Sequence, residues 1–124
     1  MKNLTRIICL TLAVLLSGAG TSWGADYYKG VFAAQSGDYA TALREFRPLA
    51  EQGDADAQNN LGRMYRKGQG VPRNYKTAFK WFSLSAEQGN AYAQFYLGVM
   101  YYNGKGVPQD YKTAVKWYTL AAEQ

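Results

Sequence analysis

The residue types that carry most enzyme chemistry are scarce in this sequence. It contains no histidine, and its one cysteine is Cys9. Histidine is the most frequent general acid or base in enzymes, and cysteine and histidine are the usual ligands of zinc. The composition therefore excludes His-dependent nucleophilic sites, Cys/His zinc centres and a disulfide framework. We predict no catalytic residues, no metal site and no cofactor, and hence a protein that is not an enzyme.

Two short motifs have the residue types of a phosphate or cation site. Gly-x-Gly occurs at 68–70 and again at 104–106, each time followed by Lys-Thr. A phosphate-binding loop needs glycine directly before the lysine and a strand before the loop, whereas tyrosine precedes both lysines here. Asp54 and Asp56 form a close carboxylate pair, but Asp54 stands where a helix cap is expected. We interpret the glycine motif as a turn and the carboxylates as helix-terminal residues.

A cluster of basic side chains is the third candidate for chemistry. Arg63, Arg66 and Lys67 are spaced i, i+3, i+4, and Arg73 follows closely. This spacing places the first three on one face of a helix. Two interpretations stay open: a solvated surface, or a contact site for an acidic partner, an anionic wall polymer or a membrane surface.

Residues 1–24 have the composition of a secretory signal peptide. Lys2 and Arg6 precede an apolar run over residues 7–16, after which small residues follow. The run is shorter than the about 20 residues that a membrane-spanning helix needs. We predict a signal over 1–24 that is cleaved after Ala19 or after Gly24, and a bacterial protein exported to the periplasm or secreted. An uncleaved membrane anchor is the alternative.

The positive charge of the whole chain belongs partly to this leader. The chain carries 14 basic and 9 acidic residues, a formal charge of +5, which falls to +3 when Lys2 and Arg6 are removed. A small charge spread along the chain is unlike the clustered charge of a nucleic-acid-binding protein. We therefore predict no nucleic acid partner and no stable membrane insertion after cleavage.

The rest of the chain repeats itself. Residues 54–88 align without a gap to residues 90–124 at an offset of 36, and 21 of the 35 aligned positions are identical. A partial copy precedes them, in which Gly30 takes the place of Gly62 and the connecting loop is shorter. Self-similarity at this period is typical of solenoid proteins. We divide the chain into an atypical first hairpin at 26–53, a repeat at 54–89 and a repeat at 90–124.

Each repeat has the pattern of two helices and no strand. In the first helix, Ala57, Leu61 and Met64 recur on one face, as the matching residues of the last repeat do. The second helix sets large aromatic residues beside small ones, and we predict that Trp81 and Trp117 are buried at its edge. Small residues let two helix axes approach while an aromatic ring fills the remaining space. The sequence thus predicts an all-α solenoid of antiparallel helix pairs.

The repeated residues resemble a known family. The motif Ala-x-Ala-Gln-x-x-Leu-Gly-x-Met-Tyr, then Gly-x-Gly-Val-Pro, then Ala-Glu-Gln-Gly closely resembles the Sel-one-like repeat (SLR) family, a longer-looped relative of the tetratricopeptide repeat. The match covers 54–89 and 90–124, and the hairpin at 26–53 looks more like a tetratricopeptide unit. The resemblance implies a right-handed α-solenoid of about three repeat units that acts as an adaptor or scaffold for other proteins.

The two repeats differ most on the first helix. Five polar residues of one repeat become aromatic or apolar in the next: Asp56 to Tyr92, Asn59 to Phe95, Asn60 to Tyr96, Arg63 to Val99 and Arg66 to Tyr102. First helices line the concave face of such solenoids, so the changed residues would form an apolar stripe there, next to a wet face on the preceding repeat. The candidate protein-binding residues are Tyr92, Phe95, Tyr96, Val99, Tyr102, Arg63 and Arg66.

Three interpretations of the stripe remain: packing against the end of the molecule, a groove for a protein partner, or a self-association surface. The function that we predict is an exported helical-repeat adaptor or scaffold that mediates protein–protein interaction without catalysis. The alternative is a structural homo-oligomer assembled through the aromatic face of the last repeat or its uncapped C-terminal end.

Overall fold

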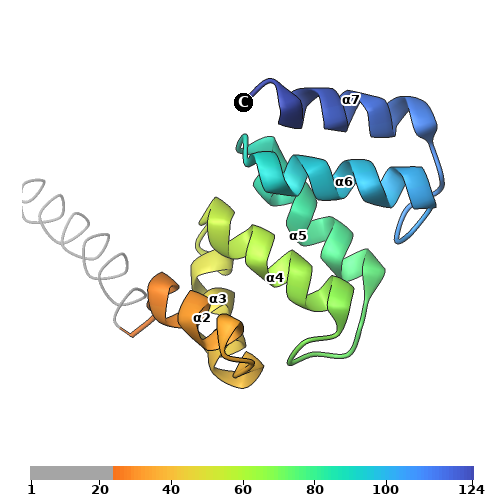
Figure 1. Cartoon of the computed structure of the whole chain (residues 1–124). Helices are drawn as coiled ribbons and strands as arrows, with labels where there is room; N and C mark the ends of the chain where they lie inside the picture. Colours follow the sequence, from red (N-terminus) through yellow and green to blue (C-terminus); the bar gives the residue numbers. More distant parts are fainter. Residues whose placement is uncertain (1–23) are drawn as a thin grey trace, which may run out of the picture.

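The computed structural model describes residues 24–124, and the predicted signal peptide up to residue 23 lies outside the described residues. Within that part the chain forms helices and no strand, which confirms the predicted all-α solenoid. The helices form three antiparallel hairpins stacked in chain order (Figure 1): α2 (Tyr27–Gln35), α3 (Tyr39–Glu51), α4 (Ala55–Lys67), α5 (Tyr75–Glu87), α6 (Ala91–Asn103) and α7 (Tyr111–Ala122). Among residues 24–124, no helix combines the length and the apolar character needed to cross a bilayer.

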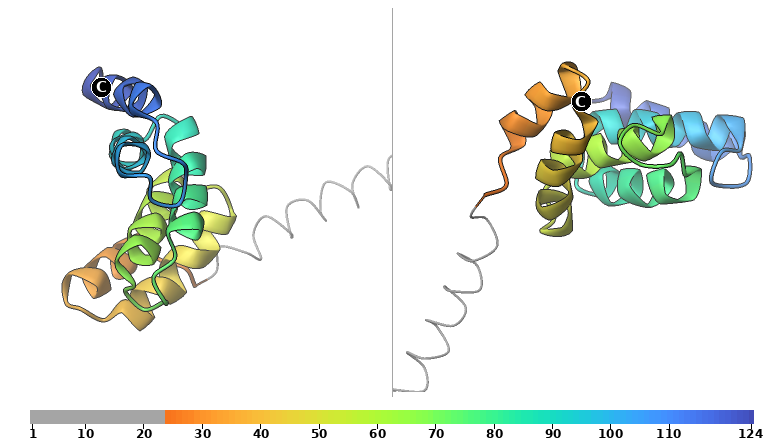
Figure 2. Two further views of the ribbon diagram at one scale, coloured as in Figure 1. Left: turned by 90° about the vertical axis from the view of Figure 1, so that its right-hand side faces the viewer. Right: turned by 90° about the horizontal axis from the view of Figure 1, so that it is seen from below.

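The first helices of the hairpins share one side of the stack. In the left view of Figure 2, α2, α4 and α6 lie along one side, and α3 and α5 lie along the other. Each helix packs against the next one in the chain. This order places the faces of α2, α4 and α6 next to one another over three successive hairpins.

Helix starts and ends are set by local side chains. Each helix from α2 to α7 follows an Asp or Asn whose side chain accepts a hydrogen bond from the backbone N–H three residues on, the ordinary N-cap arrangement: Asp26, Asp38, Asp54, Asn74, Asn90 and Asp110. Hydrogen bonds from the Thr41 hydroxyl and backbone lower the pKa of Asp38, and those from Thr113 lower the pKa of Asp110. Asp54 is thus a cap, as predicted.

The Gly-x-Gly segments form the turns between α4 and α5 and between α6 and α7. Gly68 and Gly104 end α4 and α6 in the left-handed region, with φ of +68° and +65°. Gly70 has a φ of +73°, and a Cβ there would come within 2.9 Å of the Tyr39 carbonyl oxygen. The turn therefore needs glycine both for its backbone and for its close approach to the preceding hairpin.

One contact between an aromatic ring and a glycine recurs in the core of each hairpin. Phe46, Phe82 and Tyr118 on the second helices lie on Gly30, Gly62 and Gly98 of the first helices, where an added Cβ would be 2.7–2.8 Å from the ring. Phe46 and Phe82 are fully buried. Trp81 and Trp117 differ from the prediction, because they are only partly buried and pack at the margin of the core.

Glutamine side chains tie neighbouring hairpins together. Gln58 Nε2 donates to the Ala50 carbonyl and Gln94 Nε2 donates to the Ala86 carbonyl, at 3.1 and 3.2 Å. Both glutamines are buried. These carbonyls also accept from the backbone N–H groups of Gly53 and Gly89, so the glutamine amides add a second hydrogen bond that crosses the hairpin boundary.

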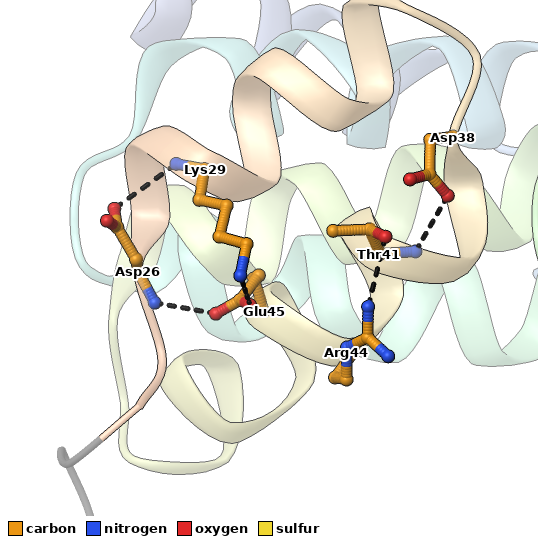
Figure 3. Close-up of polar contacts among 6 residues, drawn as sticks. All are labelled: Asp26, Lys29, Asp38, Thr41, Arg44 and Glu45. Carbon is orange, nitrogen blue, oxygen red and sulfur yellow. Dashed lines mark hydrogen bonds and ion pairs between the residues drawn. The ribbon is translucent and has the colours of Figure 1, made fainter.

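Beside its Phe46 ring, the first hairpin has polar contacts where the next hairpin has Trp81. Glu45 takes the position of Trp81 and is buried. Its Oε2 accepts from the Asp26 backbone N–H at 2.8 Å, and its Oε1 pairs with Lys29 Nζ at 3.5 Å (Figure 3). These contacts join the start of α2 to the middle of α3 and so fix the position of α2 beside the rest of the stack.

Candidate functional site

A cleft of about 340 Å³ crosses the face formed by the first helices. Each of the three helices contributes residues to its lining. Helix α2 contributes Tyr27 and Val31, helix α4 contributes Asp56, Asn59, Asn60 and Arg63, and helix α6 contributes Tyr92 and Tyr96. A second hollow of about 300 Å³ adjoins it, shares Val31, Asn60 and Arg63, and adds Lys67. The two hollows form a path across α4 with Arg63 at their junction.

Tyrosines from both neighbouring helices wall the cleft. The Tyr27 hydroxyl accepts from Asn60 Nδ2 at 3.1 Å, and burial raises the pKa of this tyrosine. The Tyr96 ring is stacked on Phe82 with centroids 4.9 Å apart, and the Arg66 guanidinium lies over Tyr96 at 4.9 Å. Tyr92 is 74% exposed at the rim. Core and polar contacts therefore hold Tyr27 and Tyr96 in place, while the Tyr92 ring stays exposed at the rim.

Two polar atoms inside the cleft have no partner. The Asn59 side chain is 6% exposed, and its Oδ1 is buried with no hydrogen-bond partner in the described part of the chain. The same holds for Nε of Arg63, whose Nη1 makes only a long 3.5 Å contact with Asn60 Oδ1. The repeat pattern predicted that Asn59 lies on a solvated face. That expectation is wrong, because the adjoining helices close over this part of α4.

The seven candidate protein-binding residues lie in three different surroundings. Tyr92, Tyr96 and Arg63 meet at the cleft. Phe95 and Tyr102 instead contact rings on α7, with centroid distances of 5.7 Å to Tyr118 and 5.1 Å to Tyr111. The remaining two, Val99 and Arg66, line a third hollow of about 280 Å³ between α4 and α6.

Cations outnumber anions along this face. Arg63 and Lys67 line the first two hollows, and Arg66 and Lys105 line the third. Asp56 is the one acidic residue among the residues that line these hollows, and its Oδ1 accepts from Asn90 Nδ2 at 2.9 Å. The face therefore attracts negative charge at the C-terminal half of α4 and repels it near Asp56.

Five residues that line the cleft were not among the candidates predicted from the sequence: Tyr27, Val31, Asp56, Asn59 and Asn60. Asn59 and Asn60 were noted only as positions that change between repeats, and Tyr27 lies in the atypical hairpin. The adjacent pair Asn59 and Asn60 could have indicated the site. Asparagine has a weak helical propensity, so two in a row inside a helix suggest that their side chains have a specific role there. The geometry fits noncovalent binding of an elongated ligand by hydrogen bonds, an aromatic ring and a guanidinium.

The fold and this face define a helical-repeat protein with a cleft across its first helices. Comparison with known families identifies which one: the Sel1 repeat model matches residues 55–90 and 91–124, so the chain belongs to the Sel1 repeat family. Sel1 repeat proteins typically mediate protein–protein interactions and form a non-catalytic scaffold family. Among proteins with curated descriptions, none matches this chain.

Two solved structures are similar to this chain. A Sel1 repeat protein from Oxalobacter formigenes is 38% identical with a TM-score of 0.76, over 80% of this chain and 41% of that one. A protective antigen present in uropathogenic Escherichia coli strains, which displays an SLR fold, is 44% identical with a TM-score of 0.68, over 69% of this chain and 18% of that one. The chain thus spans less than half the length of either protein.

Proposed function

We propose that this protein is an adaptor that binds a segment of a partner protein in the cleft across α2, α4 and α6. The observation that carries the proposal is the pair of unpartnered atoms, Asn59 Oδ1 and Arg63 Nε, buried in a cleft that three hairpins build together. A buried polar atom without a hydrogen bond costs about 1–3 kcal/mol, so a ligand that pairs with it gains affinity. The family's usual role in protein–protein interaction points the same way.

The test compares two tyrosines of α6 that face different surroundings. Tyr92→Ser removes an exposed ring at the rim of the cleft, whereas Tyr102→Ser removes a half-exposed ring that contacts α7. We expect Tyr92→Ser to weaken binding of a captured partner about tenfold or more, since a tyrosine ring that a partner covers commonly carries much of the binding energy. Tyr102→Ser should bind like wild type. Equal retention by both variants, measured by quantitative pull-down with circular dichroism as the folding control, would overturn the proposal.

Tyr96 is unsuitable for this test although the sequence placed it beside Tyr92. Its ring covers the buried Phe82 in a stacked contact. Replacing it would open the core between α5 and α6 and confuse a loss of binding with a loss of fold.

We further propose that the adaptor works outside the cytoplasm. The support is the order of residues at the start of the chain, with Lys2 and Arg6, an apolar run and then small residues. Cell fractionation followed by N-terminal sequencing tests it. The expected result is a periplasmic or secreted protein that begins at Gly20 or Ala25, while an intact N-terminus in the membrane fraction would support the uncleaved anchor instead.

Self-association is a second candidate, favoured by exposed apolar residues at the two ends of the stack. On α7, Tyr111 and Val115 are 57% and 61% exposed, although the matching residues Tyr75 and Phe79 pack in the core between α5 and α6. On α2, Phe32 is 74% exposed. A second copy whose α2 covered α7 would bury both faces, as α6 covers α5 within the chain.

Sedimentation equilibrium over a range of concentrations tests this candidate, with Val115→Lys as the variant that places a charge on α7. Self-association predicts a mass that rises with concentration for wild type and a monomer for the variant. A monomeric wild type at all concentrations would remove the candidate and leave the adaptor proposal untouched.

A further inference from the structure

We infer that the segment bound in the cleft is extended and carries an acidic side chain opposite Arg63. This inference rests on the proposed function and adds the chemistry of the ligand to it. Three observations support it: the identity of the two unpartnered atoms, the distribution of charge around them, and the way in which the two hollows meet.

The two unpartnered atoms require complementary groups. Asn59 offers an acceptor through Oδ1 and Arg63 offers a donor through Nε. The residues are four apart on α4, so their side chains lie one turn apart, about 5–6 Å between Cβ atoms. An extended peptide advances about 3.3 Å per residue. Both atoms are enclosed in the free protein, so a bound peptide pairs with them by displacing the side chains that cover them. A backbone N–H of the peptide would then meet Asn59, and the side chain of a nearby residue would meet Arg63.

Among the cations that line the three hollows, Arg63 and Lys67 have neither an anionic nor an aromatic partner, and of these two only Arg63 lines both of the first two hollows. The salt bridge found within residues 24–124 joins Lys29 to Glu45, and Arg66 has the Tyr96 ring beneath its guanidinium. Four of the nine acidic residues serve as helix N-caps and one, Glu45, is buried in the first hairpin. A half-buried guanidinium without a counter-ion gains most from a carboxylate, which it binds through charge-assisted hydrogen bonds.

The position of Arg63 favours an acidic side chain over a chain terminus. Arg63 lines both hollows and Lys67 lines the second, so a bound segment runs past Arg63 rather than stopping there. At the other end of the cleft, Asp56 repels a carboxylate. We therefore assign the acidic residue of the ligand to the Arg63 position and neutral or basic residues to the part that lies near Asp56.

Synthetic peptides test this assignment. The probes are arrays of short peptides with acetylated N-termini and amidated C-termini, each with one central Glu flanked by neutral residues, next to the same peptides with Gln in place of Glu. A third set has Gln and a free C-terminal carboxylate. Binding of the purified protein is measured by array fluorescence and, for the peptides that bind, by fluorescence anisotropy.

Two charge-removing variants complete the design. Arg63→Gln removes the cation at the junction of the hollows, and Lys80→Gln removes an exposed cation on α5 that lines none of the three hollows. The expected result is that wild type binds Glu peptides about tenfold or more tightly than their Gln counterparts. Arg63→Gln should lose this preference, and Lys80→Gln should keep it.

Three results would overturn the inference. The first is equal affinity for Glu and Gln peptides, the second is a preference for Glu that survives Arg63→Gln, and the third is a preference for the free C-terminal carboxylate over the internal Glu. If Glu and Gln peptides bind equally well but Tyr92→Ser binds neither, the proposal of a binding cleft stands and only the claim of an acidic ligand residue fails. If no peptide binds, the inference fails, and the partner pull-down with Tyr92→Ser decides the proposed function separately.

Discussion

Phe82→Ala is expected to lower the free energy of unfolding by about 3–5 kcal/mol, the usual cost of truncating a buried aromatic ring. Phe82 has no exposed surface, lies on Gly62 of α4 and is covered by the Tyr96 ring of α6. Its loss therefore leaves a cavity where three helices meet. Because a domain of this kind is stable by only about 5–15 kcal/mol, the variant should unfold at a much lower urea concentration.

The neighbouring residue provides the control for this prediction. Trp81 is larger but only partly buried, at the margin of the core. Trp81→Ala should cost clearly less than Phe82→Ala when both are followed by circular dichroism in urea. An equal or greater loss for Trp81→Ala would contradict the assignment of Phe82 as the residue on which the middle of the stack depends.

Gly62→Ala is expected to destabilise the protein by about 1–3 kcal/mol, the range for overpacking a core. The added Cβ would be 2.8 Å from Cδ1 and Cε1 of Phe82, a ring that is fully enclosed and has no room to move. Alanine has a better helical propensity than glycine by up to about 1 kcal/mol. The measured loss of stability therefore equals the cost of the steric clash minus this gain in propensity. Thermal and urea unfolding measure the net effect.

Two further variants separate the clash from other effects. Combining Gly62→Ala with Phe82→Leu should recover part of the loss, which appears as a favourable coupling energy in a double-mutant cycle. Gly98→Ala creates the same close contact with Tyr118, but that ring is partly exposed and has space to shift, so its cost should be smaller. A stabilised Gly62→Ala variant would show that the helices do not pack at the described distance.

Most of the fold follows from local patterns in the sequence. Helix pairs are predicted by three features: the offset of 36 between the repeats, the Asp or Asn residues at helix starts, and the correspondence of Gly30 in the first hairpin to Gly62 in the second. These features depend on residues close in sequence or on a repeat, which periodicity reveals directly. The helical pattern placed Phe82 on the buried face and Trp81 at its edge, but it overestimated the burial of Trp81, because only the neighbouring hairpin decides how far an edge residue is enclosed.

The candidate site could be predicted only in part, because it depends on three hairpins at once. Tyr92, Tyr96 and Arg63 were found from the differences between the repeats, and the structure brings them together. The division of the stripe was not foreseen, since helical periodicity does not show that Phe95 and Tyr102 would meet rings on α7. Nor does it show that Asn59 becomes buried.

The central claim is that a partner segment occupies the cleft, and site-specific photocrosslinking tests it most directly. A photoreactive benzophenone amino acid is placed at position 92, and in separate proteins at positions 28 and 102, which are exposed outside the cleft. The account predicts a partner adduct from position 92, reduced by Arg63→Gln, and little from the other two. An adduct of the same partner from position 28 or 102, with none from position 92, would contradict it.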